Sequence, residues 1–285
     1  ADIAMYEAKR AGRQQYRYYD QEMNGRARSR LMLEDSVRTA IANKDFTLVY
    51  QPQVCLEDGR LRGVEALLRW QHPSVGDVPP GLFLPLLEEA RLINQLSAWI
   101  YQQVAAQRQA WQATFDPELV LSVSLSSSQF NMPNLANQLQ QMLERHGLEG
   151  RQLEVEIGED CLMSNLAEST KQLQLLRRIG VRIALDDFGC GQCSLAHLRD
   201  LKFDTLKLDP QLVARLPGSA RDAAMARSII QLCEHFGVLV IAEGVETLEQ
   251  TQWLKANGCA YIQGPWAALP LMAEDVAGWS YPRAL

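Results

Sequence analysis

The sequence predicts an α/β protein that folds as a closed (β/α)8 barrel, and three observations lead to this prediction. Eight short apolar runs, typical of buried strands, alternate with segments of helical periodicity. Several helical segments end at a glycine directly before the next apolar run, and several apolar runs end in a carboxylate. Repeated strand–helix units imply parallel strands, and eight such strands suggest a barrel. An open doubly wound sheet is the alternative, although no glycine-rich phosphate loop follows the first strand.

Each predicted strand is a run of mostly apolar residues between polar or turn-forming residues. In chain order the runs are Phe46–Tyr50, Leu61–Leu68, Leu119–Leu125, Leu153–Ile157, Val181–Leu185, Thr205–Leu208, Val238–Ala242 and Ala260–Ile262. Runs this short fit strands better than helices. Because side chains alternate along a strand, mostly apolar runs also indicate strands that are buried on both faces.

Helices are predicted between the strands from the spacing of apolar residues. The clearest are residues 31–43, 94–111 and 134–146. Thr247 and Gln250 have the spacing of a capping box at the start of a later helix. Glycine suits the left-handed residue just past a helix end. Four glycines stand at such ends: Gly147, Gly180, Gly237 and Gly258.

Composition and charge narrow the class of protein. The chain has 285 residues, of which 47% are hydrophobic and 22% charged, as in ordinary globular proteins. A formal net charge of −6 argues against binding of a nucleic-acid polymer, which needs a basic surface. No apolar run reaches the length that spans a bilayer. The six scattered cysteines are expected to be reduced thiols, which favours a cytoplasmic location.

The carboxylates at the strand ends are the candidate functional residues. In a barrel of this kind the chemistry lies at the carboxyl ends of the strands. Acids gathered there repel one another unless cations hold them together, and oxygen ligands favour Mg²⁺ or Mn²⁺. The candidates are Glu65, Glu156, Asp186, Asp187 and Glu243.

A consecutive Asp-Asp pair among these acids suits two metal ions that clamp a phosphoryl group and activate a water. Lys207, at the end of its own strand, is placed to orient that water or to neutralise an oxyanion. The alternative is that such acids are solvated loop residues or helix caps. Asp209, beside Lys207, is expected to be a structural partner rather than a metal ligand.

These residues also carry a resemblance. Residues 65–70 read Glu-Ala-Leu-Leu-Arg-Trp, which resembles the motif that names the EAL domain family, the cyclic di-GMP phosphodiesterases. The resemblance covers about residues 30–275. Further motifs are matched in order: Tyr50-Gln51-Pro52, Phe83-Leu84-Pro85 with Glu88-Glu89, Glu156 with Glu159, Asp186-Asp187-Phe188-Gly189, Lys207-Leu208-Asp209, Ala242-Glu243-Gly244-Val245-Glu246 and Gln263-Gly264.

The resemblance implies a modified TIM-like (β/α)8 barrel with one antiparallel strand, and metal-assisted hydrolysis of cyclic di-GMP to linear pGpG. It implies two Mg²⁺ or Mn²⁺ ions at the five acids above. Lys207 falls on the family's catalytic lysine, with Glu65 and Glu243 beside it in the catalytic set. Arg69 matches a contact to the ligand phosphate. The remaining positions implied for the nucleotide pocket are Gln51, Leu67, Glu246 and Gln263.

The first residues resemble a different family. Ala1–Arg13 is similar to the closing helix of a GGDEF (diguanylate cyclase-like) domain. The resemblance therefore divides the chain into a GGDEF remnant with the start of a linker at 1–20, a linker at 21–30, and an EAL domain at 31–285. It implies upstream GGDEF and sensory domains as partners, and a homodimer through the EAL domain. Whether such an upstream region is anchored in a membrane stays open.

Two departures from the family pattern bear on activity. Ser124 stands where the family has an Asn metal ligand, and a hydroxyl is shorter than an amide. Gly158, beside Glu159 in a loop that the resemblance marks as regulatory, replaces a Thr and is expected to loosen that loop. The chain is therefore expected to be a phosphodiesterase, because a pure receptor gives no reason to gather five repelling acids. The alternative is a catalytically degenerate receptor for cyclic di-GMP.

Overall fold

The computed structural model describes residues 33–34, 36–189, 197 and 200–281. The predicted GGDEF remnant at 1–20 and the linker at 21–30 lie outside the described residues. The described residues divide into two compact units, one made of those up to 47 with 68–96 and the other of 48–67 with those from 97 onward. The larger unit contains most of the barrel and the five acids of the candidate metal site.

Eight strands form a closed barrel, which confirms the predicted fold class. Around the barrel the order is β1-β9-β8-β7-β6-β5-β4-β2, and pairing of β1 with β2 closes the ring. Strand β1 runs antiparallel to β9, whereas the pairs from β2–β4 round to β8–β9 are parallel. The strands are β1 (Phe46–Cys55), β2 (Leu61–His72), β4 (Val120–Leu125), β5 (Leu153–Gly158), β6 (Arg182–Phe188), β7 (Thr205–Leu208), β8 (Leu239–Ala242) and β9 (Tyr261–Ile262), with the additional short β3 (Gly76–Val78).

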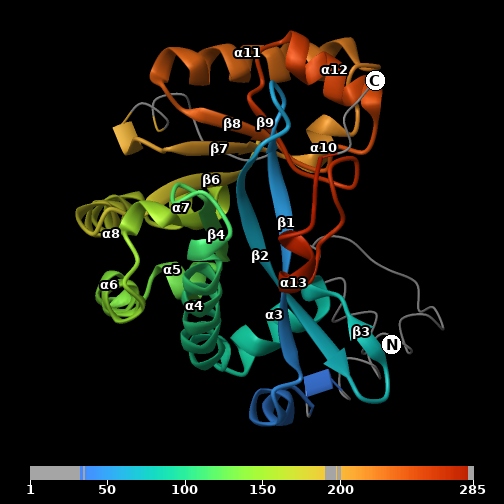
Figure 1. Ribbon diagram of the computed structural model, residues 1–285. Helices are drawn as coiled ribbons and strands as arrows, with labels where there is room; N and C mark the ends of the chain where they lie inside the picture. The colour runs from blue at the N-terminus through green and yellow to red at the C-terminus, as the bar shows by residue number, and fades with distance from the viewer. Residues whose placement is uncertain (1–32, 35, 190–196, 198–199, 282–285) are drawn as a thin grey trace, which may run out of the picture. The chain divides into compact units, whose positions relative to one another are not determined.

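Helices follow most of the parallel strands, and α8 packs against β6 as α11 does against β8 (Figure 1). The α-helices are α3 (Pro80–Glu89), α4 (Ile93–Ala110), α5 (Ser127–Phe130), α6 (Leu135–His146), α7 (Glu159–Ser164), α8 (Leu166–Arg178), α10 (Pro210–Val213), α11 (Ala220–Phe236), α12 (Leu248–Ala256) and α13 (Ala273–Val276). The 3-10 turns are η1 (Trp111–Ala113) and η2 (Gly150–Gln152). Residues 36–43 are also helical, as predicted.

The predicted helix caps are confirmed. The four glycines expected at helix ends all have positive φ, between 63° at Gly147 and 84° at Gly258. Thr247 accepts a hydrogen bond from the backbone of Gln250, whose side chain in turn accepts from Thr247, so the capping box is complete. These local signals therefore fix where each helix stops and the next strand begins.

The first strand is longer than the sequence predicted. Strand β1 runs on from Tyr50 to Cys55, through Gln51 and Gln53. The polar glutamines break the apolar pattern, but Gln53 is fully buried and hydrogen-bonded inside the barrel. A buried polar side chain with partners is stable in a strand interior, and hydropathy alone does not detect it.

The smaller unit has a core of its own. Phe46, Trp70 and Phe83 pack ring against ring with centroids 5.6–5.8 Å apart. The ring of His72 hydrogen-bonds Ser36 at 3.0 Å, and β3 pairs with the end of β2 in an antiparallel hairpin. Aromatic contacts of this kind stabilise a small core beyond the area they bury.

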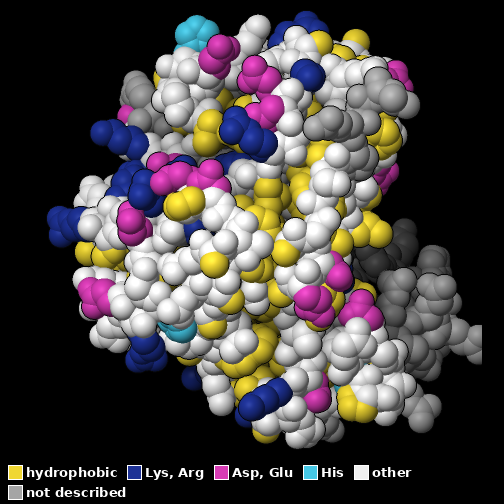
Figure 2. Space-filling view, in the orientation of Figure 1, with side chains coloured by type: hydrophobic (Ala, Val, Ile, Leu, Met, Phe, Trp, Pro, Cys, Tyr) yellow, Lys and Arg dark blue, Asp and Glu magenta, His cyan; other side chains and the backbone are white. Residues whose placement is uncertain are grey.

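Charged side chains of both signs mix on the surface. On the face drawn in Figure 2, Lys and Arg side chains lie among Asp and Glu. Within the described part of the chain no helix is both long and apolar enough to cross a membrane.

Candidate metal centre at the carboxyl ends of the strands

Lys207 lies at the centre of the carboxylate cluster. It stands on β7, its side chain is 1% exposed, and its Nζ reaches carboxylates from four other places in the barrel. The parallel strands of the barrel bring these residues, which are far apart in sequence, to one ammonium. The distances from Nζ are 3.1 Å to Glu65, 2.5 Å to Glu156, 3.5 Å to Asp186 and 2.8 Å to Glu243.

Ser124 lies at the edge of this cluster, on β4, and is itself exposed. Its Oγ donates to Oε1 of Glu65 at 2.9 Å and lies 3.3 Å from Oε2 of Glu156. The other oxygen of Glu156, Oε1, is buried and has no hydrogen-bond partner among the described residues. An orphaned carboxylate oxygen in the interior is costly, and a bound cation is one way to satisfy it.

Asp186 and Asp187 reach the same site because the strand is bulged there. Successive side chains normally point to opposite faces of a strand. Between β6 and β7 the register shifts, so that Asp186 and Asp187 lie opposite Lys207 alone. Asp187 has φ of 55°, a left-handed conformation that Asp tolerates better than most residues. Bulges of this kind re-aim side chains next to functional sites.

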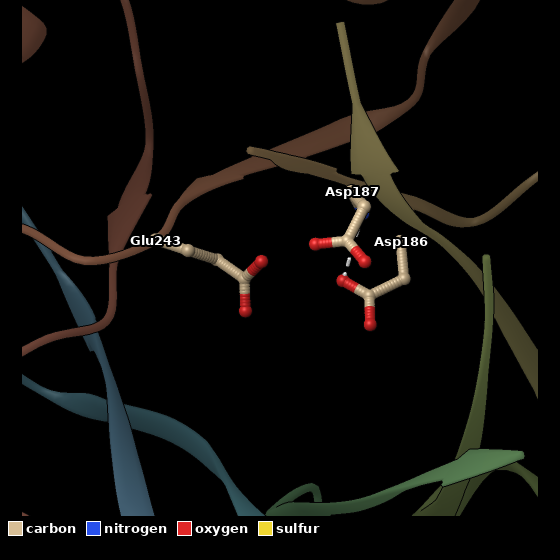
Figure 3. A group of neighbouring side chains, drawn as sticks. All are labelled: Asp186, Asp187 and Glu243. Carbon is tan, nitrogen blue, oxygen red and sulfur yellow. Dashed lines mark hydrogen bonds between the residues drawn. The ribbon is translucent and has the colours of Figure 1, made fainter. Parts of the chain in front are cut away.

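These two aspartates converge with Glu243, which follows β8. Figure 3 shows the three carboxylates turned toward one another across the strand ends. One ligand oxygen from each lies within 4.8 Å of the others. The backbone N–H of Asp187 also donates to Oδ1 of Asp186 at 3.0 Å, which holds the pair in place.

Burial and mutual repulsion shift the pKa values of the cluster. Burial, with repulsion from the other acids, raises the pKa of Glu156 and of Glu243 well above the ordinary range. Burial and repulsion from Asp186 and Asp209 raise the pKa of Asp187 to about 6. Burial disfavours the charged form of Lys207, but the surrounding carboxylates outweigh it and raise its pKa. Burial likewise opposes ionisation of Glu65, but Lys207 and Gln263 lower its pKa.

The charge balance favours divalent cations. The five acids and one ammonium together carry four negative charges when all are ionised, which two divalent ions would balance. Among the described residues the cluster offers carboxylate oxygens, which suit a hard ion such as Mg²⁺ or Mn²⁺. The orphaned Oε1 of Glu156 and the convergence of Asp186, Asp187 and Glu243 fit such ions. The Ser124 hydroxyl lies among the same acids but offers a shorter reach than an amide.

The residues predicted to line the nucleotide pocket differ in how deeply they are buried. Gln263 is 3% exposed and its Nε2 donates to Glu65 at 2.6 Å and contacts Gln51 at 3.2 Å. Leu67 is half-buried on β2, and the side chain of Glu246 is exposed just before α12. Their contacts with a nucleotide stay predictions.

Arg69 belongs to the smaller unit. It lies on β2 four residues after Glu65, and its guanidinium is 3.7 Å from Asp77. An exposed pair of this kind is weak, so the guanidinium is free to exchange Asp77 for another anion. Its contact with a ligand phosphate stays a prediction.

Gly158 and Glu159 join β5 to α7. Gly158 has φ −67° and ψ 152°, ordinary extended backbone, and a Cβ added there would meet nothing within 4 Å. Glycine is therefore not required by this geometry. Glu159 is buried and its Oε1 accepts from the backbone N–H of Gly189 at 3.0 Å. This bond ties the end of β5 to the residue that follows β6.

Sequence reasoning missed a second polar layer inside the barrel. Arg62 and Glu154 form a bidentate ion pair at 3.0 and 2.7 Å, and both side chains are buried. Thr205 bonds to both of them. The available signal was the spacing of Glu154 and Glu156, because residues two apart on a strand face the same side. Asp209, which was expected to be a structural partner beside Lys207, caps the N-terminus of α10.

With this geometry established, comparisons with known proteins define the class. The chain belongs to the EAL domain family, whose domain matches residues 34–270. The bifunctional diguanylate cyclase/cyclic di-GMP phosphodiesterase MucR of Pseudomonas aeruginosa is 37% identical over 276 residues, 97% of this chain and 40% of MucR. The oxygen sensor protein DosP of Escherichia coli is 36% identical over 279 residues, 98% of this chain and 35% of DosP. The chain thus spans two fifths or less of these relatives.

Solved structures agree with the fold. The structure of the PaMucR phosphodiesterase in complex with c-di-GMP superposes with a TM-score of 0.83 at 36% identity, over 86% of this chain and 99% of that one. The EAL enzyme Bd1971 with cAMP and cyclic-di-GMP bound gives a TM-score of 0.84 at 28% identity, over 96% and 72%. Both similarities cover most of the present chain.

Removing the charge of Asp187 should stabilise the metal-free protein. The pKa of Asp187, about 6 in the fold against 3.8 unperturbed, means that stability falls as the pH rises through this window. Asp187→Asn keeps a side chain that tolerates positive φ and removes the charge. We therefore expect a higher unfolding temperature than the parent at pH 7.5, and a smaller difference at pH 5.

The same variant should respond less to metal. Mn²⁺ should raise the unfolding temperature of the parent at pH 7.5 and should raise that of Asp187→Asn less, as followed by differential scanning calorimetry. The exposed Asp275, changed to Asn, serves as the matched control and should behave as the parent. A metal-free Asp187→Asn protein that is less stable than the parent at pH 7.5 would contradict this description of the cluster.

Replacing Gly158 should stabilise the protein. Thr at this N-cap can accept a hydrogen bond from α7 and restricts the unfolded chain, so Gly158→Thr should gain about 0.4–1 kcal/mol in the free energy of unfolding. Gly147→Thr is the control, because φ of 63° there strains any β-branched residue, and it should lose stability. Urea unfolding compares the two. A loss of stability in Gly158→Thr would show that glycine is needed there.

Proposed function

We propose that this chain hydrolyses cyclic di-GMP to linear pGpG with the help of Mg²⁺ or Mn²⁺. The observation that carries the proposal is the buried ammonium of Lys207 among four carboxylates, beside an Asp-Asp pair aimed into the same site. Relatives named as cyclic di-GMP phosphodiesterases support the choice of substrate.

The residues that would hold the ions are the acids of the cluster. They are Glu65, Glu156, Asp186, Asp187 and Glu243, with Ser124 at their edge. Divalent ions bound there supply charge neutralisation at a phosphoryl group and a water of lowered pKa. The chain itself keeps these oxygens in fixed directions through the barrel strands and the bulge in β6.

Lys207 acts as a donor in this proposal. Because its pKa is raised, its ammonium keeps its proton at neutral pH, so it cannot serve as a general base. It can hold the attacking water by hydrogen bonding and offset charge that develops on a phosphoryl oxygen. In the overall reaction, the oxygen of a water molecule bonds to one phosphorus of cyclic di-GMP and one P–O ester bond at that phosphorus breaks. The leaving sugar oxygen takes up a proton, and the single product is linear pGpG.

The second candidate function is a receptor that binds cyclic di-GMP without turnover. Ser124 favours the receptor, because its hydroxyl already donates to Glu65 and is shorter than the Asn side chain that the family has at this position. In either case we propose that the chain acts as part of a longer protein with upstream GGDEF and sensory domains, and as a homodimer. The lengths of MucR and DosP support the first of these two points.

Hydrolysis is tested directly. Purified protein incubated with cyclic di-GMP and Mg²⁺ or Mn²⁺ should release pGpG, which nucleotide chromatography separates from the substrate. Glu65→Gln should reduce product formation strongly, because it removes a ligand charge and a Lys207 partner. The exposed Glu144, changed to Gln, is the control and should leave the rate unchanged. Tight nucleotide binding with no pGpG under either metal would favour the receptor.

Ser124 is tested by restoring the longer ligand. Ser124→Asn should raise the rate of pGpG release, because the amide oxygen reaches further into the cluster. An unchanged rate in a folded variant would show that Ser124 does not limit turnover. A matched measurement of cyclic di-GMP affinity separates an effect on turnover from an effect on binding.

A further inference from the structure

A hydrogen-bonded path runs through the barrel from the layer around Arg62 to the metal centre. Arg62 Nη1 donates to Oε1 of Gln53 at 2.6 Å. Gln53 Nε2 donates to Oε1 of Gln263 at 3.2 Å. Gln263 Nε2 donates to Oε2 of Glu65 at 2.6 Å. Each of these side chains is at least nine-tenths buried, so water does not compete for the bonds.

The path has a fixed direction. A guanidinium can only donate, and an ionised carboxylate can only accept. Arg62 therefore dictates that Gln53 presents its oxygen to the guanidinium and its NH2 group to Gln263. Gln263 must then present its own NH2 group to Glu65. Gln263 Nε2 also donates to Oε1 of Gln51 at 3.2 Å, and Gln51 Nε2 donates to the carbonyl of Ala268 at 3.1 Å, so Gln53 and Gln51 together orient the amide of Gln263.

The backbone of Gln263 is fixed independently of this path. Its N–H donates to Ala242 at 2.8 Å, and its carbonyl accepts from Val245 at 3.2 Å. The next residue, Gly264, lies so close to Val245 that a Cβ would come within 2.3 Å of the Val245 nitrogen. With the backbone held by Ala242 and Val245, the orientation of the terminal amide is left to its side-chain partners, Gln53 on the path and Gln51 beside it.

We propose that Arg62 and Gln53 are positioning residues for the metal centre. By helping to fix the amide of Gln263, they hold the carboxylate of Glu65 with Oε2 bound to the path and Oε1 bound to Ser124, in the direction in which it would serve as a metal ligand. This inference rests on the metal centre of the proposed function. Groups that orient metal ligands in this way typically change metal affinity by about 10–100-fold when they are lost.

Gln53 is the residue to substitute in a test, because its replacement leaves no buried charge without a partner. Removing Arg62 would leave Glu154 buried and unpaired, which is strongly destabilising. Gln53→Met has a similar length, breaks the path and leaves Arg62 bound to Glu154 and Thr205. We expect the apparent dissociation constant for Mn²⁺ to rise by about tenfold or more, measured by isothermal titration calorimetry without nucleotide.

Gln53→Glu separates the effect of breaking the hydrogen-bonded path from the effect of changing the net charge near the metal centre. The new carboxylate can accept from Arg62 but cannot donate to Gln263, so the path is broken at the same bond. An added negative charge near the centre would by itself strengthen cation binding. We expect weaker Mn²⁺ binding than in the parent at pH 8, and binding that is equal or tighter would overturn the proposal.

The control removes a bond of Gln53 that is not in the path. Ser122 accepts from Gln53 Nε2 at 3.1 Å, so Ser122→Ala should leave the Mn²⁺ affinity unchanged. Unfolding curves recorded in parallel confirm that each variant is folded. A residue with a purely packing role would lower the unfolding temperature in Gln53→Met without changing the Mn²⁺ dissociation constant.

The readout keeps this inference apart from the proposed function. A parent protein that binds Mn²⁺ but releases no pGpG would contradict hydrolysis and leave the positioning test in force. An unchanged Mn²⁺ dissociation constant in Gln53→Met, in a protein that hydrolyses cyclic di-GMP, would contradict the positioning role alone. A parent that binds no Mn²⁺ would contradict both.

Discussion

A single buried ammonium holds the functional end of this barrel together. Lys207 lies within 3.5 Å of carboxylates from β2, β5 and β6 and from the residue after β8. Without its charge these acids would repel one another in a poorly solvated interior. The ammonium offsets only one of their charges, so the site remains strongly negative. That remaining charge suits the site to divalent cations.

The barrel supports this cluster in two physical ways. The bulge between β6 and β7 brings Asp186 and Asp187 to the same side, at the cost of a left-handed residue. In the second polar layer, the charges of Arg62 and Glu154 balance each other. This layer is hydrogen-bonded to the metal centre through the side-chain amides of Gln53 and Gln263. One layer is charge-balanced and structural, whereas the other is charge-unbalanced and suited to binding. The difference lies in whether each carboxylate already has a cationic partner.

Much of this arrangement could be predicted from the sequence, and the rest depended on tertiary contacts. Apolar runs that contain Glu65 and Glu156 or lead into Glu243 indicated strands with acids toward one edge of the sheet, because hydrophobic periodicity is a local property. The bulge was not predictable, since it depends on how β6 meets β7. The role of Gln53 was also missed, because a buried glutamine reads as an interruption of an apolar run. The expected loosening of the loop at Gly158 stays a prediction, and its extended backbone shows only that the conformation does not require glycine.

The most direct test of the central claim is to locate the cations. Crystals grown with Mn²⁺ and cyclic di-GMP, measured at the manganese absorption edge, give anomalous peaks only where the ion is bound. We predict two peaks among Glu65, Glu156, Asp186, Asp187 and Glu243, about 3.5–4 Å apart as in other two-metal sites, and none beside the Arg62–Glu154 pair. No peak in this cluster, in a protein whose barrel is intact, would contradict the account.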